Sequence, residues 1–314
     1  MPAKQEIVIT APMYPPTLAA LDADFITHRL WDAKDKTAFL APLRDRVTAI
    51  ATMGETGADA ALMDALPKAK IIASNSVGVD AIDLAAAKTR GIAVTNTPAV
   101  LTDCVADLGM ALTLAVARRV VEADRYVRSG QWPKGALGFG TKLGGKTMGV
   151  VGMGRIGQAL AQRATAFGMN VIYHSRHRKP DVAYRYYDDL AAMAKASDFL
   201  VAIIPGGAAT RHLIDARILA ALGSKGYFIN IARGSVVDEA ALVKALQDGV
   251  IAGAGLDVFA DEPRAPEALF TMDNVVLQPH QASATHETRT AMGQLMIDNM
   301  KAHFAGKPLL TPVG

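Results

Sequence analysis

The sequence predicts an α/β protein made of two Rossmann-like domains, each built on a doubly wound parallel sheet. Two observations lead to this prediction. Short β-branched runs alternate with longer helical stretches along the chain, and its 314 residues are about twice the size of a usual domain. With 51% hydrophobic and 20% charged residues, the composition is that of a folded globular protein.

The first third of the chain predicts a domain with a flavodoxin-like sheet. Its strands are expected at residues 6–10, 47–51, 70–74 and 92–96, separated by helical stretches such as 58–66 and 81–88. A last helix near residues 286–304 leaves too few residues for a domain of its own, so we expect it to return here. This substrate domain is therefore expected to be discontinuous, covering residues 1–98 and 285–314, with a cleft between it and the second domain.

The middle of the chain begins with an apolar helix and continues with an irregular segment. Residues 101–128 predict one long helix, which between Val105 and Ala117 is apolar on nearly every face and should be buried. Residues 128–145 contain six glycines and show no periodicity. This segment is either a mobile surface loop or an arm that packs on a second subunit, with Trp132 as an anchor.

The remaining part, residues 99–284, predicts a complete dinucleotide-binding domain. A βα series continues to the last helix, which is the pattern of a Rossmann fold. Its six strands are expected at residues 147–151, 170–173, 199–204, 227–231, 253–257 and 275–278.

Charge, cysteine content and hydropathy exclude several classes of protein. Thirty-three basic and 30 acidic residues give a net charge of +3, which does not predict a nucleic-acid or membrane-surface protein. Cys104 is the only cysteine, which excludes an internal disulfide and a cysteine-rich zinc or iron–sulfur site, and no metal site is expected. The longest apolar run, residues 109–117, is far shorter than the roughly 20 residues that span a bilayer, and no signal peptide is evident. A cytoplasmic location is expected.

Gly152-Met153-Gly154-Arg155-Ile156-Gly157 follows an apolar strand and opens an Ala-rich helix, which is the context of a dinucleotide fingerprint. Gly152 permits a tight turn, Gly154 lets the backbone approach a pyrophosphate, and Gly157 lets the helix pack on the strand. The helix start at Arg155 and Ile156 adds N–H groups and positive partial charge. A strand–turn–helix without a ligand is the alternative.

The end of the next strand indicates which dinucleotide binds. An NAD enzyme carries a carboxylate there, but no acid occurs before Asp181. Ser175 and Arg176 stand at this position, at the start of a basic run, and a hydroxyl with a guanidinium suits a ribose 2′-phosphate. The sequence therefore favours NADP(H), with NAD(H) as a second option; a solvated basic turn is the alternative.

Three polar residues, Arg233, Glu262 and His280, follow later strands at the edge where open α/β sheets bind ligands. Each alone could be an ordinary turn residue. Together they suit reduction of a 2-oxo acid: Arg233 can bind the carboxylate with two parallel hydrogen bonds, and His280 can protonate the carbonyl oxygen. A neighbouring carboxylate such as Glu262 would favour the protonated imidazole and fix its tautomer.

Several ordered sequence blocks resemble the D-isomer-specific 2-hydroxyacid dehydrogenases across nearly the full length of the chain. Besides the glycine fingerprint they are residues 76–80, residues 230–239, residues 255–259 with Glu262-Pro263, and Pro279-His280. Within this family the chain is most similar to NADPH-dependent hydroxyphenylpyruvate and glyoxylate/hydroxypyruvate reductases, in the blocks at residues 57–60, 141–143 and 173–176.

The resemblance implies a role for individual residues. Arg233 would bind the substrate carboxylate, Glu262 would be the partner of the histidine, and His280 would be the acid/base. Asp257 would contact the nicotinamide carboxamide, and Ile231 would line the nicotinamide side.

The resemblance also implies contributions from outside the coenzyme domain. Val77 and Gly78 would offer backbone N–H groups to the substrate carboxylate, with residues 53–54 as a weaker candidate. The family forms dimers through its coenzyme domains, so a homodimer is expected and the arm interpretation of residues 128–145 is favoured.

Two departures from the family pattern stand out. Gln281-Ala282 replaces the usual Ile-Gly, which puts the backbone beside His280 in question. Residues 137–140 replace a Phe-Pro-Leu-like stretch, which puts substrate contacts from a partner subunit in question.

Two other functions stay open at this point. One is a dinucleotide-sensing, corepressor-like binding protein, which should display a peptide groove or long disordered tails. The other is a dehydrogenase of the formate or phosphite type; formate chemistry needs no acid/base on a hydroxyl, so a Glu262–His280 pair argues against it. The natural 2-oxo acid, the coenzyme selectivity and the physiological direction do not follow from the sequence.

Overall fold

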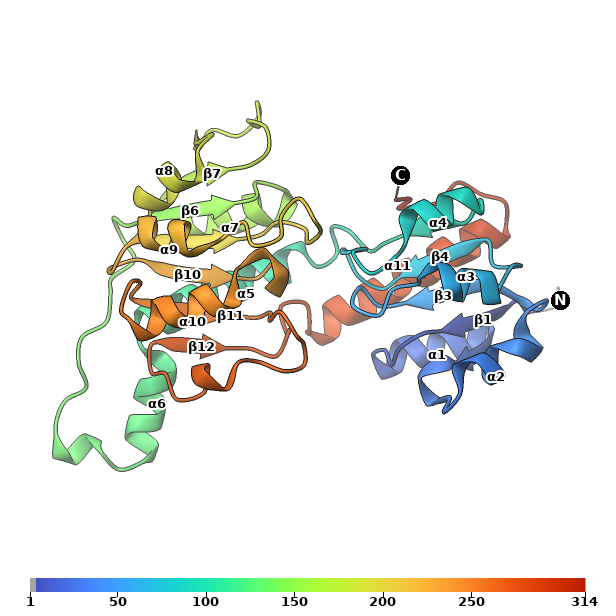
Figure 1. Cartoon of the computed structure of the whole chain (residues 1–314), viewed down its shortest axis with the longest axis horizontal. Coiled ribbons are helices and arrows are strands. Elements are labelled where there is room, and N and C mark those ends of the chain that lie inside the picture. Colours follow the sequence, from blue (N-terminus) through green and yellow to red (C-terminus); the bar gives the residue numbers. More distant parts are fainter. Residues whose placement is uncertain (1–3, 314) are drawn as a thin grey trace. The chain divides into compact units, whose positions relative to one another are not determined.

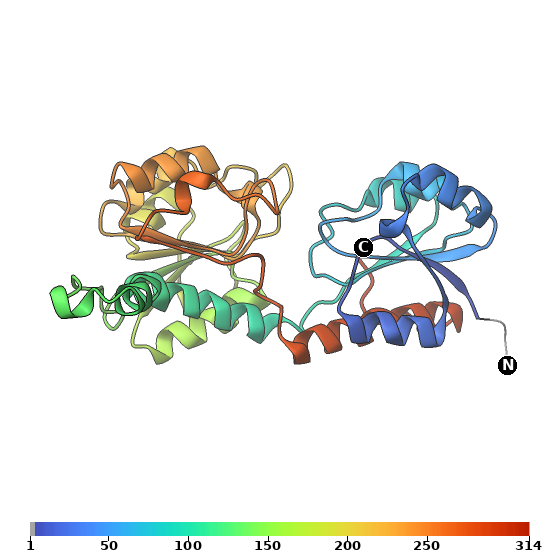
Figure 2. The same cartoon turned by 90° about the horizontal axis from the view of Figure 1, so that it is seen from below.

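The computed structural model describes residues 4–313, which form two compact units. In the described part of the chain, unit 1 comprises residues 4–101 and 284–313, and unit 2 comprises Thr102–Ser283. Each unit contains a parallel β-sheet with helices on both faces (Figures 1 and 2). These sheets confirm the predicted fold class of two doubly wound domains.

Within its described residues, unit 1 has a five-stranded sheet in the order β2-β1-β3-β4-β5, which is the flavodoxin-like order. The strands are β1 Glu6–Ile9, β2 Ile26–Arg29, β3 Val47–Thr52, β4 Ile71–Ser74 and β5 Ala93–Thr95. The sequence prediction missed β2. This strand lies at the edge of the sheet and none of its residues is buried, so no apolar run marks it.

The helices of unit 1 divide between the two faces of its sheet (Figure 2). On one face, α1 Pro15–Asp24 packs beside α11 His286–Phe304, and on the other lie α2 Lys36–Leu40, α3 Ala60–Ala65 and α4 Leu84–Thr89. Met296, Ile297 and Met300 of α11 are buried against strand residues such as Ile7 and Ile71. The last helix therefore completes the core of unit 1, as predicted.

A buried asparagine on α11 fastens the C-terminal segment to this unit. Asn299 Oδ1 accepts the N–H groups of Leu310 and Thr311 at 3.0 and 3.1 Å, and its Nδ2 donates to Thr311 Oγ1 at 2.8 Å. The Thr311 hydroxyl in turn donates to the carbonyl of Asn96 at 2.6 Å, just beyond β5. Buried polar groups of this kind are stable only when paired, so the segment and the helix hold each other.

Unit 2, which the structure describes completely, has a seven-stranded parallel sheet in the order β12-β11-β10-β9-β6-β7-β8. The strands are β6 Thr147–Val151, β7 Asn170–His174, β8 Arg185–Tyr186, β9 Phe199–Ala202, β10 Tyr227–Asn230, β11 Gly253–Leu256 and β12 Val275–Leu277. All but the two-residue β8 were predicted. The strand order reverses between β6 and β9, which is where doubly wound sheets bind their ligands.

On one face of this sheet lie α5 Thr102–Ala117 and α7 Arg155–Ala166, and on the other lie α8 Leu190–Lys195, α9 Ala216–Leu222 and α10 Glu239–Gln247 (Figure 2). The apolar helix α5 is largely buried, as predicted. It approaches β11 closely because that strand carries glycine: a Cβ at Gly255 would lie only 3.0 Å from the Cβ of Leu112.

The prediction of one helix over residues 101–128 was wrong. The helix α5 ends at Ala117, and a second helix, α6 Val120–Arg128, follows. Arg119 has a left-handed backbone with φ of 54°, and the carbonyl of Ala117 accepts the N–H of Thr141 at 2.6 Å instead of one from the next helical turn. The returning chain at Thr141 thus satisfies a carbonyl group at the end of α5, and no glycine or proline marks the break.

The segment from residue 129 to 145 is irregular and projects from the end of α6, away from the sheet of unit 2 (Figure 1). Trp132 is 68% exposed and Phe139 is fully exposed, while Leu143 is buried where the segment rejoins β6. Short 3₁₀ turns lie here and elsewhere, at Leu30–Asp32, Ala41–Leu43, Trp132–Lys134, Gly234–Val236 and Glu267–Leu269.

Most of the shorter helices begin at an aspartate whose carboxylate accepts an N–H of the first turn, which satisfies a donor that has no partner within the helix. These residues are Asp35, Asp59, Asp83, Asp189, Asp215 and Asp238, before α2, α3, α4, α8, α9 and α10.

Candidate active site

The glycine-rich loop lies between β6 and α7, at the point where the strand order of unit 2 reverses. Gly152 has a φ of 105°, and a Cβ there would overlap the carbonyl of Ile203. A Cβ at Gly157 would overlap the carbonyl of Gly152, so α7 can pack against the loop only without a side chain. At Gly154, in contrast, an added Cβ would meet nothing within 4 Å. The outer face of the loop is therefore open.

This open face fits the pyrophosphate of a dinucleotide. Gly154 and Arg155 are exposed, Ile156 is partly buried, and the 12-residue helix α7 begins at Arg155. The N–H groups of a helix start carry positive partial charge, and at Gly154 no side chain stands between them and a phosphate. The residues predicted from the glycine fingerprint therefore form a cradle of the right chemistry.

The residues predicted to select the coenzyme lie at the end of the neighbouring strand β7. The N–H of Gly152 donates to the carbonyl of His174 at 2.8 Å, which joins the glycine loop to this strand end. The Ser175 hydroxyl donates to the carbonyl of His177 at 2.6 Å, and Arg176 is exposed. Residues 174–180 contain four basic or imidazole side chains besides Arg176 and no carboxylate. A 2′-phosphate would meet cations here and no repelling acid.

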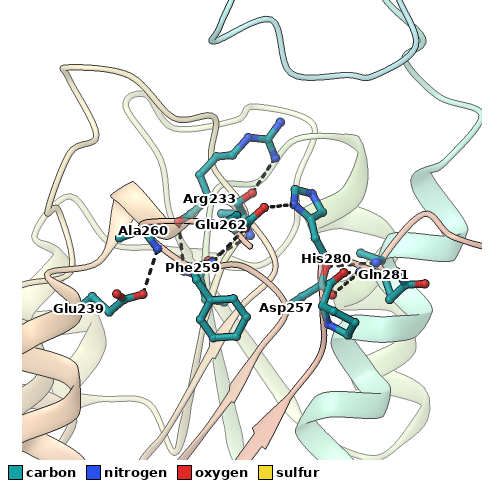
Figure 3. Close-up of polar contacts among 12 residues, drawn as sticks. Arg233, Glu239, Asp257, Phe259, Ala260, Glu262, His280 and Gln281 are labelled. Atoms are coloured by element: carbon teal, nitrogen blue, oxygen red, sulfur yellow. Dashed lines mark hydrogen bonds and ion pairs between the residues drawn. The ribbon is translucent and has the colours of Figure 1, made fainter. Parts of the chain in front are cut away.

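Arg233 is held by the end of strand β10. The fully buried Asn230 accepts the N–H of Ala232 at its Oδ1 and donates from Nδ2 to the carbonyl of Arg233, both at 3.1 Å. Arg233 Nη1 also donates to the carbonyl of Ala232 at 2.8 Å (Figure 3). A Cβ at Gly234 would overlap the backbone of Phe259, so the Arg233 turn packs directly on the loop that follows β11.

Glu262 and His280, which are 18 residues apart, are in contact. His280 Nδ1 lies 2.7 Å from Glu262 Oε2, and the other carboxylate oxygen accepts the N–H of Phe259 at 3.0 Å (Figure 3). Both side chains are about one-quarter exposed, at 26% for His280 and 25% for Glu262. The acid is therefore fixed by the backbone of its own loop and in turn orients the imidazole.

The surroundings of Glu262 favour its ionised form. Burial raises the pKa of its carboxyl, but hydrogen bonds from His280 and from the Phe259 N–H, together with the positive charge of Arg233, bring the pKa below its ordinary value of 4.5. Figure 3 shows the Arg233 side chain on the same side of the site as the Glu262–His280 pair. Arg233, Glu262 and His280 thus lie together at the carboxyl edge of β10, β11 and β12.

Asp257 lies behind this group and is almost wholly buried, with 1% of its surface exposed. Its Oδ1 accepts the N–H of Gln281 at 2.6 Å and its Oδ2 accepts the N–H of Ala282 at 3.1 Å. Burial raises the pKa of the carboxyl above its ordinary 3.8, and these two hydrogen bonds partly offset the effect. Because Asp257 uses the backbone of residues 281 and 282, the departure from Ile-Gly at these positions preserves the contact.

The predicted residues of unit 1 lie in the loop after β4. Val77 and Gly78 are partly buried, and Asn96 Nδ2 donates to the carbonyl of Val77 at 2.9 Å. A Cβ at Gly54 would overlap the Ser76 side chain, so the loops after β3 and β4 pack tightly on each other. Within unit 1 the two loops form one surface.

Two supporting residues were not predicted. Asn230 holds the Arg233 turn. The sequence feature that could have pointed to it is a polar residue at the end of an apolar strand. Glu239 accepts the N–H of Ala260 at 3.0 Å and supports the loop that carries Glu262; it belongs to the family block at residues 230–239, but no role was predicted for it. Ile231 is present as predicted but is only 6% exposed, and its side chain packs toward Gly109 of α5.

Among residues 4–313, no group of three or more histidine, cysteine, aspartate or glutamate side chains is arranged to hold a metal ion. Over the same residues, none of the helices combines the length and the apolar character needed to cross a bilayer.

The comparisons with known proteins agree with the fold. The model of the NAD-binding domain of the D-isomer-specific 2-hydroxyacid dehydrogenases matches residues 110–282. Glyoxylate/hydroxypyruvate reductase A HPR2 of Arabidopsis thaliana is 50% identical over 93% of this chain and 94% of its own length. Hydroxyphenylpyruvate reductase of Plectranthus scutellarioides is 48% identical over 98% of both chains.

Among solved structures, the NADPH-dependent glyoxylate/hydroxypyruvate reductase SMc04462 of Sinorhizobium meliloti, in complex with NADP and malonate, superimposes with a TM-score of 0.94. It is 44% identical and covers 99% of this chain and 97% of its own. The fold and the site define an NAD(P)-dependent oxidoreductase. The chain belongs to the D-isomer-specific 2-hydroxyacid dehydrogenase family, which confirms the resemblance seen in the sequence.

Proposed function

We propose that this protein reduces small 2-oxo acids to D-2-hydroxy acids, with NADPH preferred over NADH. The observation that carries the proposal is the 2.7 Å contact between His280 and Glu262, beside the charge of Arg233 and on the sheet that also bears the glycine loop. A paired imidazole is a proton donor, and a guanidinium binds a carboxylate; a 2-oxo acid needs both.

When bound, NADPH supplies the hydride that reaches C2 of the substrate. The glycine loop with Arg155 would hold its pyrophosphate, and Ser175 with Arg176 its 2′-phosphate. Ile231 is assigned to the nicotinamide side. The exposed guanidinium of Arg176 and the absence of an acid in residues 174–180 support the preference for NADPH.

His280 is assigned as the acid that protonates the carbonyl oxygen. Glu262 binds Nδ1, so the proton passes from Nε2. As the imidazolium forms in the reverse direction, the Glu262 carboxylate stabilises its charge, and its low pKa keeps it ionised for this purpose. Arg233 is assigned to the substrate carboxylate, which it would bind through two parallel N–H groups and so orient C2.

Unit 1 is proposed to contribute the N–H groups of Val77 and Gly78 to the substrate carboxylate. Two free backbone donors are a common way to bind an anion, and the packing of the Gly54 loop against Ser76 supports a rigid surface for them. The relatives named above act, by their names, on glyoxylate, hydroxypyruvate or hydroxyphenylpyruvate. We therefore place the substrate among 2-oxo acids of this size range.

We further propose a homodimer that uses the arm of residues 128–145 together with the adjoining helix α6. Val120, Val127, Trp132 and Phe139 expose between 51% and 101% of their surface, which is a large apolar area for a free monomer. A second copy of the chain would cover it. The cytoplasm, where NADPH is kept reduced, is the proposed location.

The test is the oxidation of NADPH and of NADH in the presence of glyoxylate, hydroxypyruvate and hydroxyphenylpyruvate. The proposal predicts turnover of at least one 2-oxo acid, faster with NADPH, and loss of about 10²- to 10⁴-fold in kcat for His280→Asn. Turnover of none of the three acids with either coenzyme would contradict it. The D configuration of the product is checked by chiral chromatography.

A further inference from the structure

The loop after β4 carries the two backbone N–H groups that the proposed function assigns to the substrate carboxylate, those of Val77 and Gly78. Both residues are partly buried, and within residues 4–313 neither N–H donates to another group of the protein. An N–H group without a partner in the chain is available to a ligand. The direction in which these two groups point then decides whether they can bind an anion.

The carbonyl groups of the same peptide units are both held from the end of the neighbouring strand β5. The Ser76 carbonyl accepts the N–H of Thr97 at 2.9 Å, and the Val77 carbonyl accepts a hydrogen bond from Asn96 Nδ2, also at 2.9 Å. Strands β4 and β5 are parallel neighbours, so the chain that leaves β5 runs beside this loop.

Holding these carbonyls also sets the two N–H groups. A trans peptide unit carries its C=O and its N–H on opposite sides. The Ser76 carbonyl shares its peptide unit with the N–H of Val77, the Val77 carbonyl shares its own with the N–H of Gly78, and both units are trans. Both N–H groups therefore point away from residues 96 and 97, and successive N–H groups that face one way are a common anion site.

The two hydrogen bonds differ in what supplies the donor. At Ser76 it is a backbone N–H, which any residue except proline would supply at position 97. At Val77 it is the side-chain amide of Asn96, so this contact depends on the residue type. The peptide unit that it holds precedes a glycine, and glycine lets a peptide unit turn at little cost, so this unit needs an anchor.

The C-terminal segment fixes Asn96 on both sides of its backbone. The N–H of Asn96 donates to the Thr311 carbonyl at 3.3 Å, and its carbonyl accepts the Thr311 hydroxyl at 2.6 Å. The buried Asn299 of α11 holds Thr311 in turn. Within unit 1, a continuous set of hydrogen bonds thus runs from the last helix to the loop after β4.

We propose that Asn96 is a positioning residue: by holding the Val77 carbonyl, its side chain aims the N–H of Gly78 at the substrate carboxylate. The inference rests on the proposed function, in which Val77 and Gly78 bind that carboxylate. It adds a residue that determines the affinity for the substrate without touching it.

The experiment compares Asn96→Asp and Asn96→Ala in the full-length protein. Asn96→Asp keeps the shape but sets an oxygen against the Val77 carbonyl, which repels it. Asn96→Ala removes the donor without this repulsion and carries the test if the aspartate variant does not fold. Asn274→Asp is the matched control, since Asn274 is also partly buried and donates from Nδ2 to a backbone carbonyl, that of Ala252, but lies at the amino end of β12.

The measurements are kcat and KM for the 2-oxo acid that the wild type reduces fastest, the Kd of NADPH by fluorescence, and the NMR order parameter of the Gly78 N–H without ligands. We expect Asn96→Asp to raise KM by roughly 10- to 100-fold, because an N–H aimed at a charged group is lost. The kcat should change by less than about threefold, since the carboxylate is bound alike before and during the reaction. The Kd of NADPH should change by less than about twofold, because the glycine loop lies in unit 2.

The order parameter reports the position of the loop independently of activity. It should fall from about 0.85 in the wild type to below about 0.6 in Asn96→Ala, since the peptide unit before Gly78 loses its anchor. Thr311→Val removes the hydroxyl that holds the Asn96 carbonyl and should raise KM by a smaller factor. In the Asn96→Ala background the same change should have no further effect on KM.

An unchanged order parameter of Gly78 in Asn96→Ala would overturn the inference, as would an unchanged KM in both Asn96 variants or an equal rise of KM in Asn274→Asp. Failure of the proposed function would look different: the wild type would then turn over no 2-oxo acid, whatever the Gly78 N–H does in the variants.

Discussion

The imidazole of His280 and the carboxylate of Glu262 lie 2.7 Å apart, although the two residues belong to loops that follow different strands, β12 and β11. The strands are neighbours in the sheet of unit 2, so their carboxyl ends deliver both loops to one place. Glu262, which the sequence shows only as a residue before a proline, and His280, which it shows only as a loop histidine, are thereby brought into contact.

Glu262→Gln should lower kcat for 2-oxo acid reduction by about 10²-fold and leave the KM of the substrate nearly unchanged, because the acid orients and charges the imidazole and does not touch the substrate. The neutral amide no longer favours the imidazolium, so the alkaline limb of the kcat profile should move to lower pH. Steady-state kinetics across pH check this. A KM effect with constant kcat would be inconsistent with the assigned role.

Glu262 should also make the stability of the protein depend on pH. Its pKa in the folded state lies below the ordinary 4.5, so its ionised form stabilises the fold above that value, and the contribution is lost as pH falls through the lower folded pKa. Urea unfolding of the wild type and of Glu262→Gln should therefore differ at neutral pH, and the difference should shrink as the pH falls below 4.5 and through the lowered pKa of the folded state. A difference that grows on acidification would contradict the shift.

Arg176→Ala should raise the KM for NADPH by roughly 10- to 150-fold, the equivalent of about 1.5–3 kcal/mol for a charge-assisted hydrogen bond to the 2′-phosphate, and should affect NADH little. Arg178→Ala removes the same charge from the same exposed turn and is the control, with a smaller effect expected. If Arg176→Ala weakens both coenzymes equally, the 2′-phosphate is bound elsewhere.

Two glycine variants should separate coenzyme binding from folding. Gly154→Ala adds a methyl group to open space on the face assigned to the pyrophosphate, so it should leave Tm unchanged and weaken NADPH binding by about tenfold. Gly157→Ala forces its methyl group into the carbonyl of Gly152 and should cost roughly 1–3 kcal/mol of stability. Calorimetric melting and fluorescence titration measure the two effects; a large loss of Tm in Gly154→Ala would show that the loop is packed on that face.

The double variant Trp132→Ser/Phe139→Ser should convert the proposed dimer into a monomer, because it removes two of the exposed apolar side chains of the arm. Phe270→Ser is the matched control, since Phe270 is 56% exposed but lies outside the arm. Sedimentation equilibrium gives the mass of each. A wild-type protein that sediments as a monomer would remove the basis for the arm's assigned role.

The sequence predicted those features that leave a local pattern. Apolar runs gave the strands of unit 2 apart from β8, and residue chemistry at strand ends gave Arg233, Glu262 and His280. The edge strand β2 and the break at Arg119 left no such pattern, because an exposed strand carries no apolar alternation and the contact made at the break comes from Thr141, which is distant in sequence.

The supporting contacts of the site could not be predicted for a related reason. The side chains of Asn230, Glu239 and Asp257 form hydrogen bonds with backbone groups. Because every residue has a backbone, the residue type of the partner does not reveal such a contact in the sequence. Only the folded chain shows that Asp257 reaches residues 281 and 282.

Because unit 1 needs α11 to complete its core, the two units can complete their folds only in a fixed order during translation. The first segment of unit 1, up to Leu101, is translated before unit 2. Ile7, Ile71 and their neighbours nevertheless lack the helix that covers one face of their sheet until Met296 and Met300 have been translated. Unit 2 is contiguous and complete by Ser283. Unit 2 is thus able to fold while the core of unit 1 is still incomplete. During that interval the apolar strands of unit 1 are exposed, and a chaperone is suited to shield them.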